Sequence, residues 1–345
     1  MADKAQAAHR PLTAGCLFSG MGGFCGGLKA AGINTLWANE LDYYAALAFS
    51  ANHAEAHMEN KDVSKLSVAN DRLQPVDILT AGFPCQSFSL AGMRLGFDDE
   101  RGLLFEHILR IIGEFGANKP KVILLENVPH LASGEGGKWL HAIITKIQLA
   151  GYWFDKSNCH TLKTDEISDL PQSRERLFMV AASTDAFYCN DFDFPQPCED
   201  LRPLSDFIDR RKKLADEYYL PEDNRYCRQI ADKIKKHGAE NGICQLRRSY
   251  SRAYKHKCPT LTANMGGGGH NVPFIRDEWG IRRLTVEECA ALQGFDGYQF
   301  PDAAPEKECY RQIGNAVSLP VAAQLAMSCR RLLESDSRCK ERIAA

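Results

Sequence analysis

The chain has 345 residues, 44% of them hydrophobic and 25% charged, and its formal net charge is −2. The length and this composition predict a globular protein with one large α/β domain and a smaller one. The net charge does not favour nucleic-acid binding, which would require a locally basic surface. No apolar run approaches the roughly 20 residues of a membrane helix, and the start does not resemble a signal peptide, so we expect a cytoplasmic protein. The 13 cysteines include no CxxC pair, which argues against a disulfide framework and against a metal site.

A strand, a glycine turn and a helix are predicted for residues 15–31. Gly20, Gly22 and Gly23 allow the backbone to approach a ligand closely, and the helix that follows offers the N–H groups of its first turn. The dinucleotide fingerprint GxGxxG is incomplete, because Cys25 stands where its third glycine belongs. The turn therefore favours a ligand other than a pyrophosphate, and a nicotinamide-dependent oxidoreductase is the least favoured function.

A second strand, over residues 35–39, ends at Glu40. Doubly wound folds place a carboxylate for ribose hydroxyls at about this spacing, which predicts that Glu40 binds a ribose. The alternative is an acid that stabilises the first turn of a helix through the helix dipole. The residue alone leaves both interpretations open.

The stretch from residue 77 to 101 places a cysteine just beyond a predicted buried strand. Glycines and a proline around it stop regular structure, so a loop leaves the end of the strand, where open α/β sheets bind ligands. We therefore expect Cys85 at the entrance of a ligand-binding site. A small buried cysteine is the alternative, but the polar neighbours Gln86, Ser87 and Ser89 argue against it.

Residues 103–182 continue the alternation of strands and helices. Apolar residues at helical spacing predict a helix over 103–115, and four consecutive apolar residues predict a buried strand that ends at Glu126 and Asn127. The other elements expected here are a helix over 139–150 and strands over 152–160 and 177–182. This β-α order predicts a parallel sheet, with Glu126 at the same edge as Cys85.

Two arginines, Arg174 and Arg176, precede the last of these strands. Residues two apart on an extended segment face the same side, so we expect both guanidinium groups on one face. Ordinary surface charges are the alternative interpretation of this pair.

The composition changes between residues 183 and 281. Long apolar runs become rare and basic residues accumulate, interleaved with Tyr250 and Tyr254, which predicts a second, smaller domain. Residues 265–270, MGGGGH, predict a flexible loop able to lie close to a groove. Because charge runs are more often solvated faces than binding sites, the basic segment alone is compatible with either.

The last part of the chain returns to helical patterns. Thr285 and Glu288 form a capping box at the start of a helix that stops at Gly294. The segment QIGNAVSLPVAAQLA follows from residue 312, and residues 331–345 predict a helical tail. The chain therefore completes its first domain after an insertion.

Several of these segments resemble motifs of the DNA (cytosine-5)-methyltransferases, in the family's order. They are FSGMGGF from residue 18, GFPCQSFS from residue 82, QSRERLF from residue 172, RRLTVEECAALQGF from residue 282 and QIGNAV from residue 312. The resemblance is to the compact bacterial, restriction-modification type. It implies an S-adenosylmethionine-dependent methyltransferase fold, a Rossmann-like, doubly wound and mostly parallel sheet. It also implies a catalytic and cofactor-binding domain at 1–182, a target-recognition domain at 183–281 and C-terminal motifs of the catalytic domain at 282–345.

The resemblance carries residue roles to the matching positions. The catalytic residues that it implies are Cys85, Glu126, Arg174 and Arg176. The cofactor-binding residues are Phe18, Gly20, Gly22, Gly23, Glu40, Leu41, Asp62, Val63, Pro84 and Asn315. The DNA-binding residues are Gln86, Ser87, Arg247, Arg248, Thr260, Leu261 and Gly267. The sequence departs from the family at Lys61, where a glycine usually precedes the acid at position 62.

The implied reaction transfers a methyl group from S-adenosyl-L-methionine to carbon 5 of a cytosine flipped out of duplex DNA, leaving S-adenosyl-L-homocysteine. Carbon 5 is a poor nucleophile until a thiolate adds to carbon 6, and cysteine suits that step because its thiolate is intrinsically very nucleophilic. The partner implied is double-stranded DNA in the bacterial nucleoid. A restriction endonuclease would be paired with the enzyme unless it is an orphan, and we expect a monomer.

Two other functions stay open at this stage. A tRNA cytosine-5 methyltransferase of the same superfamily is the nearest rival, although the Cys-Phe-Thr element that this relative usually carries is absent from the second domain. A non-catalytic DNA-binding protein would require the loss of Cys85 or Glu126, and both are present.

Overall fold

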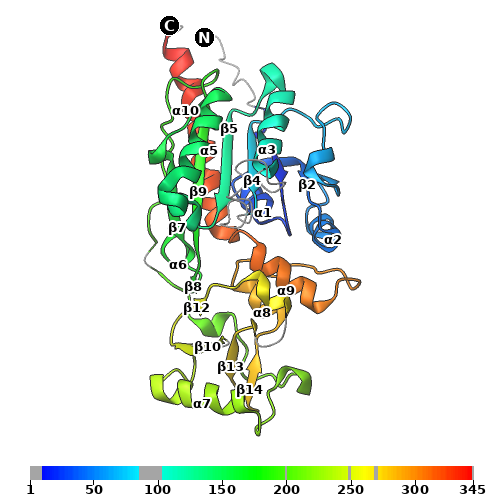
Figure 1. The fold of residues 1–345 in the computed structure, drawn as a ribbon, viewed down its shortest axis with the longest axis vertical. Helices are drawn as coiled ribbons and strands as arrows, with labels where there is room; N and C mark the ends of the chain where they lie inside the picture. Colours follow the sequence, from blue (N-terminus) through cyan, green and yellow to red (C-terminus); the bar gives the residue numbers. More distant parts are fainter. Residues whose placement is uncertain (1–9, 85–102, 199, 248–249, 268–270, 344–345) are drawn as a thin grey trace, which may run out of the picture.

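A computed structural model describes residues 10–84, 103–198, 200–247, 250–267 and 271–343. Within these residues eight strands form one sheet, the large sheet, in the order β3-β2-β1-β4-β5-β9-β6, with β7 also paired to β9 (Figure 1). The strands are β1 (Thr13–Leu17), β2 (Asn34–Asn39), β3 (His57–Glu59), β4 (Ile78–Gly82), β5 (Val122–Asn127), β6 (Tyr152–Trp153), β7 (Cys159–Lys163) and β9 (Glu175–Ser183). The pairs from β3 to β5 are parallel, whereas β9 runs antiparallel to β5, β6 and β7. The predicted mostly parallel α/β class is confirmed.

Both faces of the large sheet are covered, so its central strands are buried and mostly apolar. All six residues of β5 are buried: Val122 and Leu124 belong to one apolar core, and Ile123 and Leu125 to the other. The helices of the first face are α1 (Gly23–Ala30), α2 (Tyr43–Asn52) and α10 (Leu319–Ile343), and those of the second are α3 (Leu103–Glu114) and α5 (Lys138–Leu149). Two single-turn helices, α4 (His130–Ser133) and α6 (Thr164–Ile167), lie in the connections.

The single strand predicted over residues 152–160 is wrong. Strand β6 ends at Trp153, a 3-10 turn follows, and β7 begins at Cys159. A capping box interrupts the strand, because the Asp155 carboxylate accepts from Ser157 N at 2.6 Å and the Asn158 side chain accepts from Asp155 N at 3.0 Å. Such local side-chain to backbone bonds compete with a strand ladder.

A second, four-stranded antiparallel sheet, the small sheet, has the order β11-β10-β13-β14 (Figure 1). Its elements are β10 (Ile243–Leu246), β11 (Ser251–Tyr254), β13 (Phe274–Arg276), β14 (Ile281–Arg283) and the helix α7 (Arg225–His237). Helix α7 packs Ile230 and Ile234 on the sheet. Residues 187–194 still pack on the large sheet, through Phe187, Phe192 and Phe194.

Two short elements and two helices connect the sheets. Strand β8 (Gln172–Ser173) pairs in parallel with β12 (Cys258–Pro259), and α8 (Val286–Ala291) and α9 (Glu306–Asn315) lie between the sheets (Figure 1). Helix α8 starts at the predicted capping box, with Glu288 N donating to Thr285 Oγ1 at 3.1 Å and Thr285 N to the Glu288 carboxylate at 2.9 Å.

The predicted flexible loop over residues 265–270 needs correction in its first part. Residues 263–267 form a 3-10 turn, η9, packed on α9, and Met265 is buried in the apolar core between the sheets. A Cβ on Gly266 would lie 2.4 Å from Lys307 O, so glycine permits a close approach of two backbones here. Residues 268–270 lie outside the described residues.

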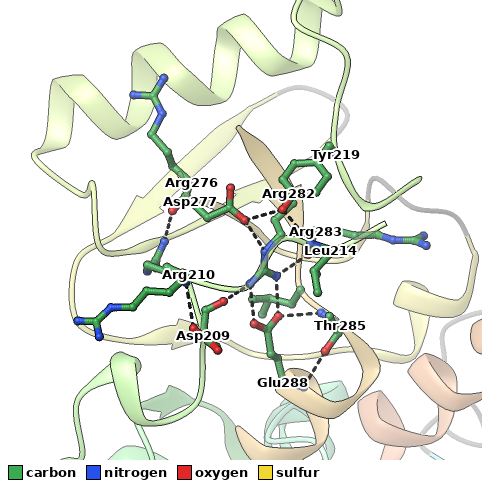
Figure 2. A network of polar contacts seen from close by, with 12 residues as sticks. Asp209, Arg210, Leu214, Tyr219, Arg276, Asp277, Arg282, Arg283, Thr285 and Glu288 are labelled. Atoms are coloured by element: carbon green, nitrogen blue, oxygen red, sulfur yellow. Dashed lines mark hydrogen bonds and ion pairs between the residues drawn. The ribbon is translucent and has the colours of Figure 1, made fainter. Parts of the chain in front are cut away.

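A buried arginine, Arg282, ties the small sheet to α8 (Figure 2). Its Nε donates to Asp277 at 2.9 Å, and its two terminal nitrogens donate to the two Glu288 carboxylate oxygens at 2.8 and 2.7 Å. The same nitrogens also donate to Arg283 O and Asp209 O, both at 3.1 Å. Every N–H of the guanidinium therefore has an acceptor, although its side chain is fully buried.

In the described part of the chain, no helix combines the length and the apolar character that crossing a bilayer requires.

Replacing Arg282 by methionine should destabilise the protein by about 3–5 kcal/mol, because it leaves two buried carboxylates without their partner. Urea unfolding measures the change. Lys213→Met is the matched control: its ion pair with Asp216 is 4.0 Å long and exposed, so we expect a change within about 0.5 kcal/mol. A loss for Arg282→Met no larger than that of the control would contradict the assignment.

Candidate functional site

A cleft of about 670 Å3 lies at the edge of the large sheet where β1, β2, β4 and β5 end. Its volume is within the range of small-molecule sites. Of the residues predicted for cofactor and catalysis, those that line it are Phe18, Gly20, Gly23, Glu40, Leu41, Asp62, Val63, Pro84, Glu126, Arg176 and Asn315. The cleft thus brings together residues from seven separate segments of the sequence.

The glycine turn after β1 forms one wall of this cleft. Gly20 and Gly22 have φ values of 55° and 93°, in the left-handed region that glycine adopts without strain. Gly22 N–H donates to Ser19 O at 2.9 Å, which closes the turn. Gly22 itself does not line the cleft, since a Cβ there would lie 2.3 Å from His53 Nε2 at the end of α2.

The Glu40 carboxylate fixes this turn to the end of β2. Its two oxygens accept from Gly20 N and from Asp42 N, both at 2.8 Å. Burial raises the pKa of Glu40, and these backbone N–H groups oppose the shift. Both carboxylate oxygens retain lone pairs that can accept from ligand hydroxyls. Beside them Leu41 is 66% exposed, an apolar surface at the cleft.

Asp62 reaches the cleft from the turn after β3. Its carboxylate accepts from Ser64 N at 2.8 Å, and this backbone hydrogen bond lowers the pKa of Asp62. Lys61, the departure from the family pattern, pairs instead with Glu59 at 3.0 Å and with Asp71. The lysine ammonium therefore pairs with carboxylates that do not line the cleft, whereas Asp62 does line it.

Glu126 lies near the end of β5 and lines the same cleft as the glycine turn. Its side chain is 10% exposed, and Arg176 Nε lies 3.0 Å from Oε1. Burial raises the pKa of Glu126, while the charges of Arg176 and then Arg174 oppose the shift. A carboxyl group with a raised pKa can keep its proton closer to neutral pH and donate a hydrogen bond.

The chain leaves β4 directly beside Glu126. A Cβ on Gly82 would lie 3.4 Å from Glu126 Oε2, and Asn127 Nδ2 donates to Phe83 O at 2.9 Å. Pro84 lines the cleft at this exit. The predicted nucleophile Cys85 comes next in the sequence and lies outside the described residues.

Arg174 does not share the surroundings of Arg176. It is 1% exposed and absent from the cleft lining, and its guanidinium donates to Leu261 O at 2.7 Å, Gly314 O at 3.1 Å and Ala316 O at 2.7 Å. The two arginines are close enough for their charges to interact, but only Arg176 contacts Glu126.

The residues predicted to bind DNA are only partly described. Gln86, Ser87 and Arg248 lie outside the described residues, Gly267 is exposed at the end of η9, and Arg247 is partly exposed just after β10. Thr260 donates its hydroxyl to Ser173 O, and Leu261 is 1% exposed. The pair at 260–261 therefore lies in the connection between the sheets, with the leucine in the core.

Two charged residues of the cleft were missed by the sequence analysis. Arg311 on α9 forms an ion pair with Asp42 at the start of α2, and both line the cleft. Asp42 also caps α2, accepting from Ala45 N at 2.9 Å. The signal was present, because Arg311 lies four residues before Asn315 and so on the same helix face.

The family model described as C-5 cytosine-specific DNA methylase matches residues 13–331. The chain belongs to this family. Among its curated relatives, the Type II methyltransferase M.Bsp6I of Bacillus sp. (strain RFL6) is 38% identical over 90% of this chain and 96% of its own. M.NlaX of Neisseria lactamica is 33% identical over 93% and 97%, and M.HhaI of Haemophilus parahaemolyticus is 32% identical over 90% and 91%.

Solved structures agree at the level of the fold. The Entamoeba histolytica methyltransferase EhMeth has a TM-score of 0.68 with 20% identity, covering 94% of this chain and 99% of its own. A Spodoptera frugiperda DNMT2 mutant has a TM-score of 0.70 with 18% identity, covering 92% and 99%. The family match and the Type II relatives show that this DNA methylase is a DNA (cytosine-5-)-methyltransferase, whose cofactor is S-adenosyl-L-methionine.

Gly23→Ala should destabilise the methylase by about 1–3 kcal/mol, because the new Cβ would lie 2.4 Å from Val317 O at the cleft wall. Binding of S-adenosylhomocysteine, measured by calorimetry, should weaken in parallel. Gly113→Ala in α3 is the control, with nothing within 4 Å of the new Cβ, and should stabilise by about 0.5–1 kcal/mol. If both substitutions changed the free energy of unfolding in the same direction, the close contact between Gly23 and Val317 would not explain the effect.

The ionisation of Glu126 should appear in the pH dependence of stability. Its folded pKa lies above the ordinary 4.5, so the folded state binds the proton more tightly. The resulting stabilisation is complete below 4.5 and is lost as the pH rises through the folded pKa. Arg176→Met removes the opposing charge and should extend this loss to higher pH. Urea unfolding between about pH 4 and 8, with Glu126→Gln as the reference, measures it; a constant difference between wild type and reference would refute it.

Proposed function

We propose that this methyltransferase acts on a cytosine flipped out of a specific short sequence in duplex DNA, through a covalent bond between Cys85 and carbon 6. The observation that carries the proposal is the position of Glu126. This carboxyl group, with its raised pKa and its Arg176 partner, shares one cleft with the glycine turn, Glu40 and the strand exit that leads to Cys85.

Glu126 and Cys85 divide the chemistry on the base. The Cys85 thiolate adds to carbon 6, which makes carbon 5 enamine-like and able to form a bond to a methyl group. Protonated Glu126 donates to nitrogen 3 and relieves the negative charge that builds up on the ring. Once carbon 5 carries the methyl group, loss of its proton and return of the nitrogen-3 proton to Glu126 expel the Cys85 thiolate and release 5-methylcytosine. Arg176 holds the Glu126 carboxyl in place for this step.

The cleft residues fit the cofactor. When bound, S-adenosyl-L-methionine supplies an electrophilic methyl group on a positively charged sulfur. Glu40 accepts from ribose hydroxyls and Asp62 from the adenine amino group, while the exposed side chain of Leu41 packs on an apolar face of the ligand. Phe18, Gly20, Gly23, Val63, Pro84 and Asn315 complete the cofactor lining in this proposal, and Gly22 contributes through the shape of the turn.

The base must leave the duplex before it can reach Glu126, because carbon 6 and nitrogen 3 are inaccessible in a stacked pair. In this proposal residues 85–101, which lie outside the described residues, close on the DNA, and Gln86 or Ser87 fills or lines the space that the base vacates. Arg247, Arg248, Thr260, Leu261 and Gly267 belong to the proposed recognition part at 183–281. A net charge of −2 means that phosphate contacts depend on such local basic groups.

The relatives named as Type II methyltransferases support a place in a restriction-modification system. In this proposal the enzyme acts as a monomer on nucleoid DNA in a bacterial cytoplasm. It protects that DNA from a companion endonuclease or works as an orphan.

Transfer of tritium from labelled cofactor to duplex DNA, with tRNA in a parallel reaction, tests the proposed function. We expect label in DNA only, a fall in kcat of about 10²–10⁴-fold for Glu126→Gln, and no turnover for Cys85→Ala. Glu287→Gln, an exposed glutamate on α8, is the control and should match wild type. Label in tRNA, or turnover by Cys85→Ala, would reject the proposal. Bisulfite sequencing of DNA from expressing cells identifies the modified sequence.

A further inference from the structure

Arg174 joins three segments that are far apart in the sequence. It lies between β8 and β9, and its terminal nitrogens reach Leu261 O, before η9, and Gly314 O and Ala316 O, at the end of α9. Its Nε is buried without a hydrogen-bond acceptor among the described residues. Nor does Arg174 form an ion pair with any described carboxylate, in contrast to Arg176.

A buried cation held only by carbonyl dipoles is unfavourable, since its desolvation is not offset by a close opposite charge. Burial accordingly lowers the pKa of Arg174. An apolar side chain could fill this volume without that penalty. The guanidinium is therefore explained by the geometry of its contacts, because its planar fork can bond several carbonyls at once.

The segments that Arg174 bonds form one continuous wall of the cofactor cleft. A Cβ on Gly314 would lie 2.1 Å from the Thr262 carbonyl carbon and 2.2 Å from Ala263 N, so the two backbones touch. Asn315 lies between the two carbonyls bonded by Nη2, and both it and Ala263 line the cleft. Ala263 begins η9, and the next element in the sequence is β13 of the small sheet.

We propose that Arg174 is a positioning residue that holds the Asn315 wall and the Leu261–Gly267 segment in one arrangement, so that cofactor binding and DNA binding are coupled through it. Unlike Arg176, it does not contact Glu126. This inference rests on the proposed function. It gives Arg174 and Arg176 different roles, although both lie in the segment QSRERLF and were predicted to be catalytic.

Arg174→Lys keeps the charge but replaces the planar fork by one ammonium group. We expect its Kd for S-adenosylhomocysteine to rise about 10-fold, while kcat at saturating cofactor and DNA stays within about 3-fold of wild type. Arg176→Lys should do the opposite, lowering kcat with little change in Kd. Arg202→Lys, on an exposed pair with Asp206, is the control. A 10-fold loss of saturated kcat in Arg174→Lys with an unchanged Kd would overturn the proposal.

A second measurement does not depend on the folding of a variant. In wild-type protein, S-adenosylhomocysteine should increase hydrogen-exchange protection of residues 262–267 together with 312–317. Protection confined to 312–317 would overturn the coupling. If the wild type binds S-adenosylhomocysteine but methylates no DNA, the proposed function fails, while this exchange experiment still decides the role of Arg174.

Discussion

The burial of one carboxyl group, that of Glu126, is the constraint on which the site depends. Strand β5 has no exposed residue, so a carboxyl group near its end is removed from water. Such a group needs a polar partner in the protein. Arg176 supplies that partner from β9, the neighbouring antiparallel strand. The reversal of direction at β9 thus has a chemical consequence, because it brings the start of a strand, with its arginine, to the edge where the parallel strands end.

The segment 171–176 also determines how the two sheets meet. Within a few residues it forms β8, which pairs with β12, then places Arg174 among three carbonyls, and then delivers Arg176 to Glu126. On the other side of the connection, Arg282 bonds the small sheet to α8 with every donor satisfied. Buried polar networks that are fully satisfied fix one arrangement of the elements they join. The part of the chain that carries the small sheet is therefore held at a defined position relative to the cleft.

Local sequence patterns predicted the elements whose causes are local. The apolar run before Glu126, the helical spacing over 103–115 and the capping box at Thr285 were all found where expected, as β5, α3 and the start of α8. The prediction of one strand over 152–160 was wrong because a capping interaction at Asp155 replaces the hydrogen bonds of a strand pair. The prediction of a flexible loop was wrong at Met265, because contact with α9, a helix that begins only at Glu306, buries this side chain.

The sequence by itself determined which groups stand at the ends of strands: the glycine turn at 20–23, Glu40, Pro84 and Glu126 all line one cleft or adjoin it. The alternation of strands and helices along the chain suffices for that, since parallel strands end at a common edge. Only the tertiary structure separated Arg174 from Arg176, paired Asp42 with Arg311 and placed Leu261 in the core. These outcomes depend on which distant backbone carbonyl or carboxylate meets each side chain, and that is decided by packing between segments whose separation in the chain leaves no local pattern.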